Sequence, residues 1–182
     1  MKRIRKFEMR NYIPNLGNRL DGIHFQDQKQ IVTDGHYLIA VQCFYPKGME
    51  GMTLDKNFQP FGKDVKFPKW ENAIPDISTG YKSYDFSVGD LSIMYRLKGN
   101  SIRIKDSEKV LGYISPYLMD VMIEFMNRFI CSARVYVPDD KSKAWKIVTE
   151  STENFMVLMP RMEEQFIPYE YDINRKCLTI FK

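Results

Sequence analysis

The chain has 182 residues, a formal net charge of +4, and 44% hydrophobic and 27% charged residues. This composition excludes a disordered chain, and at this length about two thirds of the unfolded surface can be buried without disulfides or structural metals. The three cysteines are odd in number and unrelated in spacing, which favours a reducing cytosol over a disulfide framework or a metal knuckle. No run approaches the ~18 apolar residues that span a bilayer, and the N-terminus lacks the apolar core of a secretion signal. A cytoplasmic protein is therefore expected.

The first part of the chain predicts a short helix followed by a hairpin. Residues 9–16 place apolar side chains at helical spacing, but Pro14 removes a backbone donor, so the helix is expected to be short or kinked. Residues 20–26 and 30–44 have the composition of two strands. A polar stretch interrupts the second strand and predicts a bulge or, because glycine accepts positive φ, more readily a tight turn. That stretch consists of Thr33, Asp34, Gly35 and His36.

The middle of the chain is less regular. Residues 46–105 are interrupted by prolines and glycines, so this segment is expected to be an irregular insertion. Periodicity returns inside it at residues 84–87, 91–97 and 101–105. These three runs predict strands, the last two joined as a hairpin.

The clearest helix of the chain follows a predicted strand at residues 109–114. Ser115 is a candidate N-cap, and Pro116 suits the first helical position. The apolar residues that follow share one face, which predicts a helix packed on a sheet. They are Leu118, Val121, Met122, Phe125 and Phe129.

Strand signals dominate after this helix. Residues 133–137, 144–149 and 154–159 predict a three-stranded meander. Residues 169–172 and 177–181 predict a short hairpin added at the end. The fold class is therefore α+β, and the order of a helix followed by a strand meander occurs twice.

Five stretches, taken in order, resemble the later part of one protein family. They are residues 20–25 (LDGIHF), 31–41 (IVTDGHYLIAV), 67–75 (FPKWENAIP), 113–122 (YISPYLMDVM) and 155–162 (FMVLMPRM). The family is that of the bacterial DNA sliding clamps, the beta subunit of DNA polymerase III. The resemblance implies the DNA-clamp fold, in which helices line the inside of a ring around DNA and antiparallel sheets form the outside. It also implies a pocket that accepts short peptides from polymerases and clamp loaders.

The resemblance also implies which residues form that pocket. By resemblance, the partner-peptide pocket is lined by Thr33, Gly35, His36, Leu38, Pro68, Ala73, Tyr117, Met159 and Pro160. Two departures from the family pattern concern charge: Tyr37 stands where a basic residue usually follows TDGH, and Arg161 and Met162 are in inverted order. The charge at the rim of the pocket is therefore expected to differ from that of the family.

A basic cluster at the N-terminus provides the residues expected to contact DNA. They are Lys2, Arg3, Arg5, Lys6 and Arg10. If all five met phosphates, the logarithm of affinity would fall with the logarithm of salt concentration at a slope of about −4 to −5. The solvent side of the predicted helix carries Asp120 and Glu124, whose carboxylates repel phosphate. The helix is therefore a poor match to the wall of a DNA channel.

Two domain arrangements fit the resemblance, because the chain is shorter than a full clamp subunit. The first is a single clamp-like domain over residues 1–162, with the insertion at 46–105, followed by an extension at 163–182. The second joins abbreviated versions of the last two clamp domains at residues 67–75. The first is preferred, since one helix-plus-meander half lies on each side of the insertion.

The sequence carries no strong signal of catalysis or metal binding. His36 beside Asp34 has no third ligand at a recognisable spacing, so a turn histidine is expected, and no enzyme, metal or cofactor is predicted. The predicted function is that of a sliding-clamp-like processivity or docking factor that encircles DNA or binds replication proteins. The alternative is a clamp-derived interaction module or inhibitor that forms no ring. The predicted partners are replication proteins carrying clamp-binding peptides, with duplex DNA and a further copy of the chain as candidates.

Overall fold

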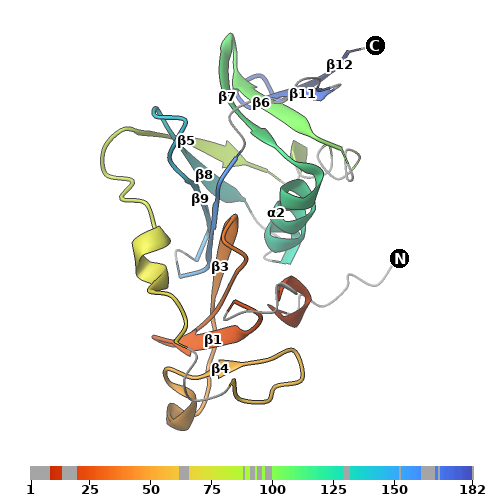
Figure 1. Ribbon diagram of the computed structural model, residues 1–182. Coiled ribbons are helices and arrows are strands. Elements are labelled where there is room, and N and C mark those ends of the chain that lie inside the picture. Colours follow the sequence, from red (N-terminus) through yellow and green to blue (C-terminus); the bar gives the residue numbers. More distant parts are fainter. Residues whose placement is uncertain are drawn as a thin grey trace.

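The computed structural model describes residues 9–13, 20–61, 66–87, 89–90, 93, 96, 100–128, 132–151, 153–160, 167 and 169–181. These residues form two β-sheets and a helix in an elongated molecule, with the N-terminal strands at one end and the smaller sheet at the other (Figure 1). No helix in this part of the chain is long and apolar enough to cross a membrane.

The larger sheet has eight strands in the order β4-β1-β2-β3-β10-β9-β8-β5, and the smaller has four in the order β12-β11-β6-β7. The strands of the larger sheet are β1 (Ile23–Gln26), β2 (Lys29–Thr33), β3 (Tyr37–Gln42), β4 (Thr53–Leu54), β5 (Tyr81–Phe86), β8 (Ala133–Pro138), β9 (Trp145–Thr149) and β10 (Phe155–Leu158). Those of the smaller sheet are β6 (Ile102–Asp106), β7 (Lys109–Ile114), β11 (Tyr169–Asp172) and β12 (Cys177–Ile180). Three short 3-10 helices accompany them: η1 (Met9–Tyr12), η2 (Lys47–Met49) and η3 (Trp70–Ala73).

The predicted meander after the helix is confirmed as β8, β9 and β10, which pair in succession. β10 also pairs with β3 and so joins the two ends of the chain into one sheet, with Leu38 opposite Val157. Because side chains alternate along a strand, Tyr37 and Ile39 face the helix while Leu38 and Ala40 face the opposite side. The larger sheet therefore has an apolar layer on each face.

The polar interruption in the strand predicted over residues 30–44 is a full turn, which divides that range into β2 and β3. Gly35 has a φ of 92°, which an L side chain rarely adopts. The Asp34 carboxylate accepts the backbone N–H groups of His36 at 2.7 Å and Tyr37 at 2.9 Å. The tight turn is therefore the correct choice between the two alternatives that the sequence left open.

The strong helix is confirmed as α2 (Pro116–Arg128). Its N-cap is Ser115, whose hydroxyl accepts the backbone N–H of Leu118 at 3.4 Å. The predicted apolar stripe is buried as far as the structure describes it, and Phe129 lies outside the described residues. The buried surface is wider than predicted and includes Ile123, because α2 packs in one core with side chains from both sheets.

Residues 46–105 contribute β4 and β5 to the larger sheet and β6 to the smaller one. The prediction of a strand over residues 91–97 is wrong where the structure describes that range, because Ile93 is helical and Arg96 lies in a turn. The rest of that range lies outside the described residues. At the other end of the chain, β11 and β12 form a hairpin, and β11 extends the smaller sheet by pairing parallel with β6. The division of the chain into one domain or two stays a prediction.

Candidate functional site

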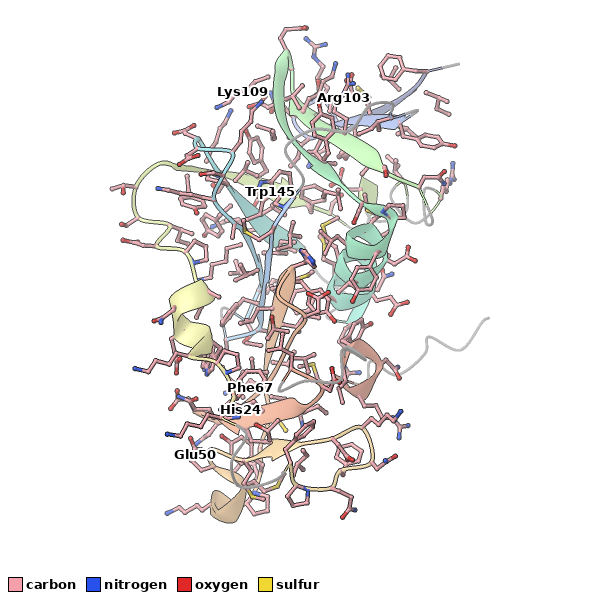
Figure 2. The ribbon with its side chains drawn as sticks, viewed as in Figure 1. His24, Glu50, Phe67, Arg103, Lys109 and Trp145 are labelled. Carbon is pink, nitrogen blue, oxygen red and sulfur yellow. The ribbon has the colours of Figure 1, made fainter. Side chains whose placement is uncertain are left out.

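A long connection, here called the strap (residues 66–76), crosses the face of the larger sheet that lies opposite α2. At its start the ring of Phe67 stacks on the imidazole of His24, with centroids 4.6 Å apart and planes inclined by 4° (Figure 2). Further on, the indole N–H of Trp70 donates to Gln26 Oε1 at 3.0 Å. The Trp70 ring lies 6.4 Å from that of Phe155 on β10. The strap is therefore held on the sheet by aromatic contacts at β1 and β10.

Under the strap lies a compact group of buried side chains, here called the outer cluster. Its members come from β2, β3, β9, β10 and η3, and they are Ile31, Leu38, Ala40, Trp70, Val148, Phe155 and Val157. Phe67, Ile74 and Ala144 pack against this group from its rim. Leu38 is 3% exposed, so in this structure it supports the site from below and does not offer its own surface.

Four of the residues assigned to the pocket by resemblance meet at the β2–β3 turn, and they are called the turn cluster: Thr33, His36, Leu38 and Met159. Thr33 lies opposite Leu38 in the β2–β3 register, and its hydroxyl donates to the carbonyl of Tyr37 at 2.5 Å. The backbone N–H of Met159 donates to the carbonyl of His36 at 2.9 Å. The Met159 side chain is 39% exposed, so this end of the sheet presents a flexible apolar side chain to solvent.

The other predicted pocket residues lie around the turn cluster at different depths. Gly35 is exposed at the turn itself, and Pro68 is half-buried on the strap. Pro160 follows Met159 and packs against β7, where a Cβ added at Gly112 would lie 3.2 Å from it. Tyr117 lies on the opposite face of the sheet, since its ring is 6.0 Å from that of Tyr37.

Tyr37 explains the departure from the family pattern at the position after TDGH. It is 2% exposed, and its hydroxyl donates to the backbone carbonyl of Tyr12 in η1 at 2.5 Å. Burial, reinforced by its hydrogen bond with Tyr117, raises the pKa of Tyr37 far above that of a free tyrosine. The side chain is therefore a neutral anchor for η1 and α2, and this position adds no charge to the rim.

A cleft of about 420 Å³, here called the strap cleft, opens between the later part of the strap and the turn that joins β8 to β9. It is lined by Asn72, Ala73, Ile74, Pro75, Asp76, Thr79, Tyr81, Lys143 and Ala144. The hydroxyl of Tyr81 donates to the carbonyl of Ala144 at 3.1 Å and so fixes one wall. Of the residues assigned to the pocket by resemblance, Ala73 alone lines the strap cleft.

Two charged side chains, Asp76 and Lys143, line the strap cleft. The Asp76 carboxylate accepts the backbone N–H of Ser78 at 3.0 Å. This hydrogen bond and one from the Ser78 side chain lower the pKa of Asp76. Lys143 lines the same cleft and acts on Asp140, whose pKa is lowered first by hydrogen bonds from Ser142 and further by the charge of Lys143. The sequence did not identify Tyr81, Lys143 and Ala144 as site residues, because none of them lies in a stretch that resembles the clamps. The strap cleft is therefore lined by one acidic and one basic side chain.

A second cavity, of about 240 Å³, lies between η1 and α2 and bears on the predicted DNA contacts. The hydroxyl of Tyr12 donates to the Glu124 carboxylate, and Asp120 Oδ1 is buried without a hydrogen-bond partner among the described residues. Of the residues predicted to contact DNA, Arg10 is exposed on η1. Lys2, Arg3, Arg5 and Lys6 lie outside the described residues. In the described part of the chain, no group of three or more His, Cys, Asp or Glu side chains is placed to hold a metal ion.

Solved structures of bacterial sliding clamps have a similar fold. The chain is similar to the Caulobacter (C. crescentus) beta sliding clamp, with a TM-score of 0.57 and 15% identity over 85% of this chain and 61% of that one. It is similar to the DNA polymerase III beta chain of Streptococcus pneumoniae, with a TM-score of 0.59 and 13% identity over 88% and 63% of the two chains. A DNA polymerase III beta subunit structure from Eubacterium rectale gives a TM-score of 0.58 and 10% identity over 90% and 62%.

The chain has the sliding-clamp fold. The predicted α+β class and the resemblance to the clamps are thereby confirmed at the level of fold. The chain spans about three fifths of the length of these clamp structures. No protein-family model and no curated protein sequence matches it.

Proposed function

We propose that this chain is a sliding-clamp-like docking protein, which binds short peptides of replication proteins at the strap cleft and the adjoining turn cluster. The observation that carries the proposal is the preformed strap cleft on a clamp fold, next to the residues that resemble a clamp pocket. Its volume of about 420 Å³ lies within the range of about 300–1,000 Å³ that is usual for ligand sites. Because Phe67 and Trp70 already hold the strap, a peptide would bind without first ordering it.

The walls of the site suit a peptide with apolar anchors. Ala73, Ile74 and Ala144 supply aliphatic surface, and Met159 supplies an exposed thioether that adapts to leucine or phenylalanine side chains. Ile74 and Ala144 pack against the outer cluster that contains Leu38, so the strap cleft and the turn cluster belong to one face. The proposed role is binding in the cytoplasm without catalysis.

Encirclement of duplex DNA by an oligomer is the second candidate function, favoured by the clamp fold itself. Two features of α2 weigh against it: the Glu124 carboxylate points outward, and η1 covers part of the outward face through Tyr12. Light scattering tests this candidate, because a ring requires a stable oligomer. A strict monomer that binds peptide would support docking and exclude a ring. An oligomer would support encirclement if the logarithm of its DNA affinity falls with the logarithm of salt concentration at a slope of about −4 to −5.

Titration of the protein with a short labelled peptide carrying leucine and phenylalanine tests the docking function. Ala73→Trp fills the strap cleft from an exposed position, so we expect binding to weaken about tenfold or more while the melting temperature stays the same. Lys56→Trp, an exposed substitution in the turn after β4, is the matched control and should leave binding unchanged. Failure of the wild-type protein to bind such a peptide with a Kd below about 1 mM would refute the proposal.

A further inference from the structure

β12 is the outermost strand of the smaller sheet. It pairs antiparallel with β11, from Asp172 opposite Cys177 to Tyr169 opposite Ile180. Among the residues that the structure describes, no strand pairs with the other edge of β12, which lies at the outer end of the sheet in Figure 1. The backbone N–H and C=O groups on that edge are therefore available to a further strand.

The side chains of this strand do not protect its edge. Ile180 is 60% exposed and Phe181 is 40% exposed, and the run from 177 to 181, CLTIF, contains no charged residue, proline or glycine. Natural edge strands are usually guarded by a lysine, a proline or a bulge, because an open apolar edge invites another chain. An unguarded edge of this kind is suited to strand addition.

Contacts at both ends of β12 hold the edge on the rest of the molecule. The Asp90 carboxylate accepts the hydroxyl of Tyr171 on β11 and lies 3.3 Å from the Lys176 ammonium at the start of β12. At the far end of β12, the Arg103 guanidinium lies 5.9 Å from the centre of the Phe181 ring. A partner strand would therefore meet a preformed template, with little ordering cost on this side.

The charges around the hairpin indicate the chemistry of the partner. The side chains of Arg175 and Lys176 are 61% and 41% exposed, whereas those of Asp172 and Asp90, which neutralise them, are 1% and 3% exposed. The Lys176 ammonium also donates to the backbone carbonyl of Asp85 and lies 5.0 Å from the centre of the Phe86 ring, so it is held on the protein. Arg175 is therefore the cation that this end of β12 presents to solvent. A partner with acidic residues at this end gains Coulomb attraction there.

A second copy of the chain is a poorer occupant of this edge. A second copy of this segment offers Arg175 no acidic partner, because residues 175–181 (RKCLTIF) contain neither aspartate nor glutamate. The observations therefore favour a partner segment of opposite charge.

We propose that β12 accepts an extended segment of another protein as a fifth strand of the smaller sheet, with apolar side chains and an acidic residue at the end that lies beside Arg175. This surface is distinct from the strap cleft, which lies on the larger sheet, so either proposal can fail without the other. The backbone edge gives the affinity, Ile180 and Phe181 give apolar contact, and Arg175 selects an acidic residue at the end of the partner segment that lies beside it.

Fluorescence anisotropy with the labelled peptide Asp-Glu-Val-Thr-Val-Thr-Val-Glu-Asp tests strand addition. Two further versions carry N-methyl groups on alternate residues, one on the odd and one on the even positions. Only one set of amides can face β12, so one version should lose binding about tenfold or more while the other keeps it. Amide hydrogen exchange should slow at residues 178–180 when the unmethylated peptide is added, and not in the strap. Equal binding of all three peptides, or equal loss with both methylated versions, would overturn the proposal.

Charge selection is tested on the full-length protein with Arg175→Glu, because Arg175 is exposed and its ion pair with Asp172 is long, at 3.7 Å. We expect the acidic peptide to bind about threefold to tenfold more weakly, and a version with lysine ends to bind more tightly. Lys56→Glu makes the same charge change at an exposed site in the β4 turn and should alter neither. The protein could instead form a dimer in the absence of peptide. If that dimer slows exchange of the same amides and is abolished by Ile180→Lys, the edge binds a second copy of the chain and the proposal is overturned.

Discussion

The imidazole of His24 and the ring of Phe67 stack almost parallel, with centroids 4.6 Å apart. This contact joins β1 to the strap that borders the candidate peptide site. The histidine is 7% exposed, and its two ring nitrogens lie 3.0 Å from Thr53 Oγ1 and 3.2 Å from Gln26 Oε1. The strap is therefore attached to a buried titratable group.

Acid should loosen the strap. Burial lowers the pKa of His24 below its ordinary 6.5, although Gln26, Glu71 and Glu50 raise it in part. His24 therefore binds a proton more readily in the unfolded chain than in the folded chain. The free energy of unfolding consequently falls as the pH falls through about 6.5 towards the lower pKa of the folded state. We expect the melting temperature and the protection of strap amides to drop between about pH 8 and about pH 5.5.

His24→Phe should remove this pH-dependent part, because a phenylalanine still stacks on Phe67 and does not titrate. His36→Gln at the exposed turn is the control and should keep the wild-type pH profile. An identical decline with pH in the wild type and in His24→Phe would show that another group is responsible.

The buried face of α2 can be checked by a pair of adjacent substitutions. Phe125 is 0% exposed, so Phe125→Ala should lower the free energy of unfolding by about 3–5 kcal/mol. Glu124 is exposed and accepts the hydroxyl of Tyr12, so Glu124→Ala should cost no more than about 1 kcal/mol. Denaturant melts measure both, and equal losses would contradict the assigned face.

The β11–β12 hairpin should depend on the buried carboxylate of Asp90. Burial raises the pKa of Asp90, but hydrogen bonds from Tyr171 and Ser87 and the charge of Lys176 outweigh burial and hold it below the ordinary 3.8. The stabilisation is therefore fully present above about pH 4 and is lost as the pH falls further.

Asp90→Asn should cost about 1.5–3 kcal/mol, the range for hydrogen bonds to a charged group, and should flatten the decline of stability in acid. Hydrogen exchange of the β11 and β12 amides reports the loss locally. Asp85→Asn, at an exposed carboxylate that pairs with Arg134, is the matched control and should have little effect. Unchanged exchange in Asp90→Asn would mean that the hairpin is held by other contacts.

Substitutions at Met159 and at its neighbour Leu158 distinguish a role in peptide binding from a role in stability. Met159 is 39% exposed, so Met159→Ala should weaken the leucine- and phenylalanine-bearing peptide by about 1–2 kcal/mol and leave the melting temperature nearly unchanged. Leu158 is 0% exposed, so Leu158→Ala should instead lower stability by about 2–5 kcal/mol. A peptide titration and a thermal melt of each variant test this, and a large drop in the melting temperature of Met159→Ala would make Met159 a core residue.

Several features of this protein were determined by short stretches of sequence. α2 is predictable because Ser115 caps it, Pro116 suits its first position, and its apolar residues recur at helical spacing. The turn at Asp34 and Gly35 is predictable because the side-chain carboxylate and the glycine φ act within four residues. The order of short motifs was enough to identify the clamp fold, although identity to the solved clamps is only 10–15%.

Other features were decided only by the tertiary structure, because they depend on contacts between residues far apart in the chain. The β3–β10 pairing brings His36 to Met159, and the approach of η1 makes Tyr37 a buried anchor, a role that its departure from the family pattern did not reveal. Lys143 reaches the strap cleft because the β8–β9 turn folds towards the strap. The parallel pairing of β11 with β6 leaves β12 as an open edge. In each case the local sequence is compatible with more than one environment, and the free energy of packing against distant strands selects one.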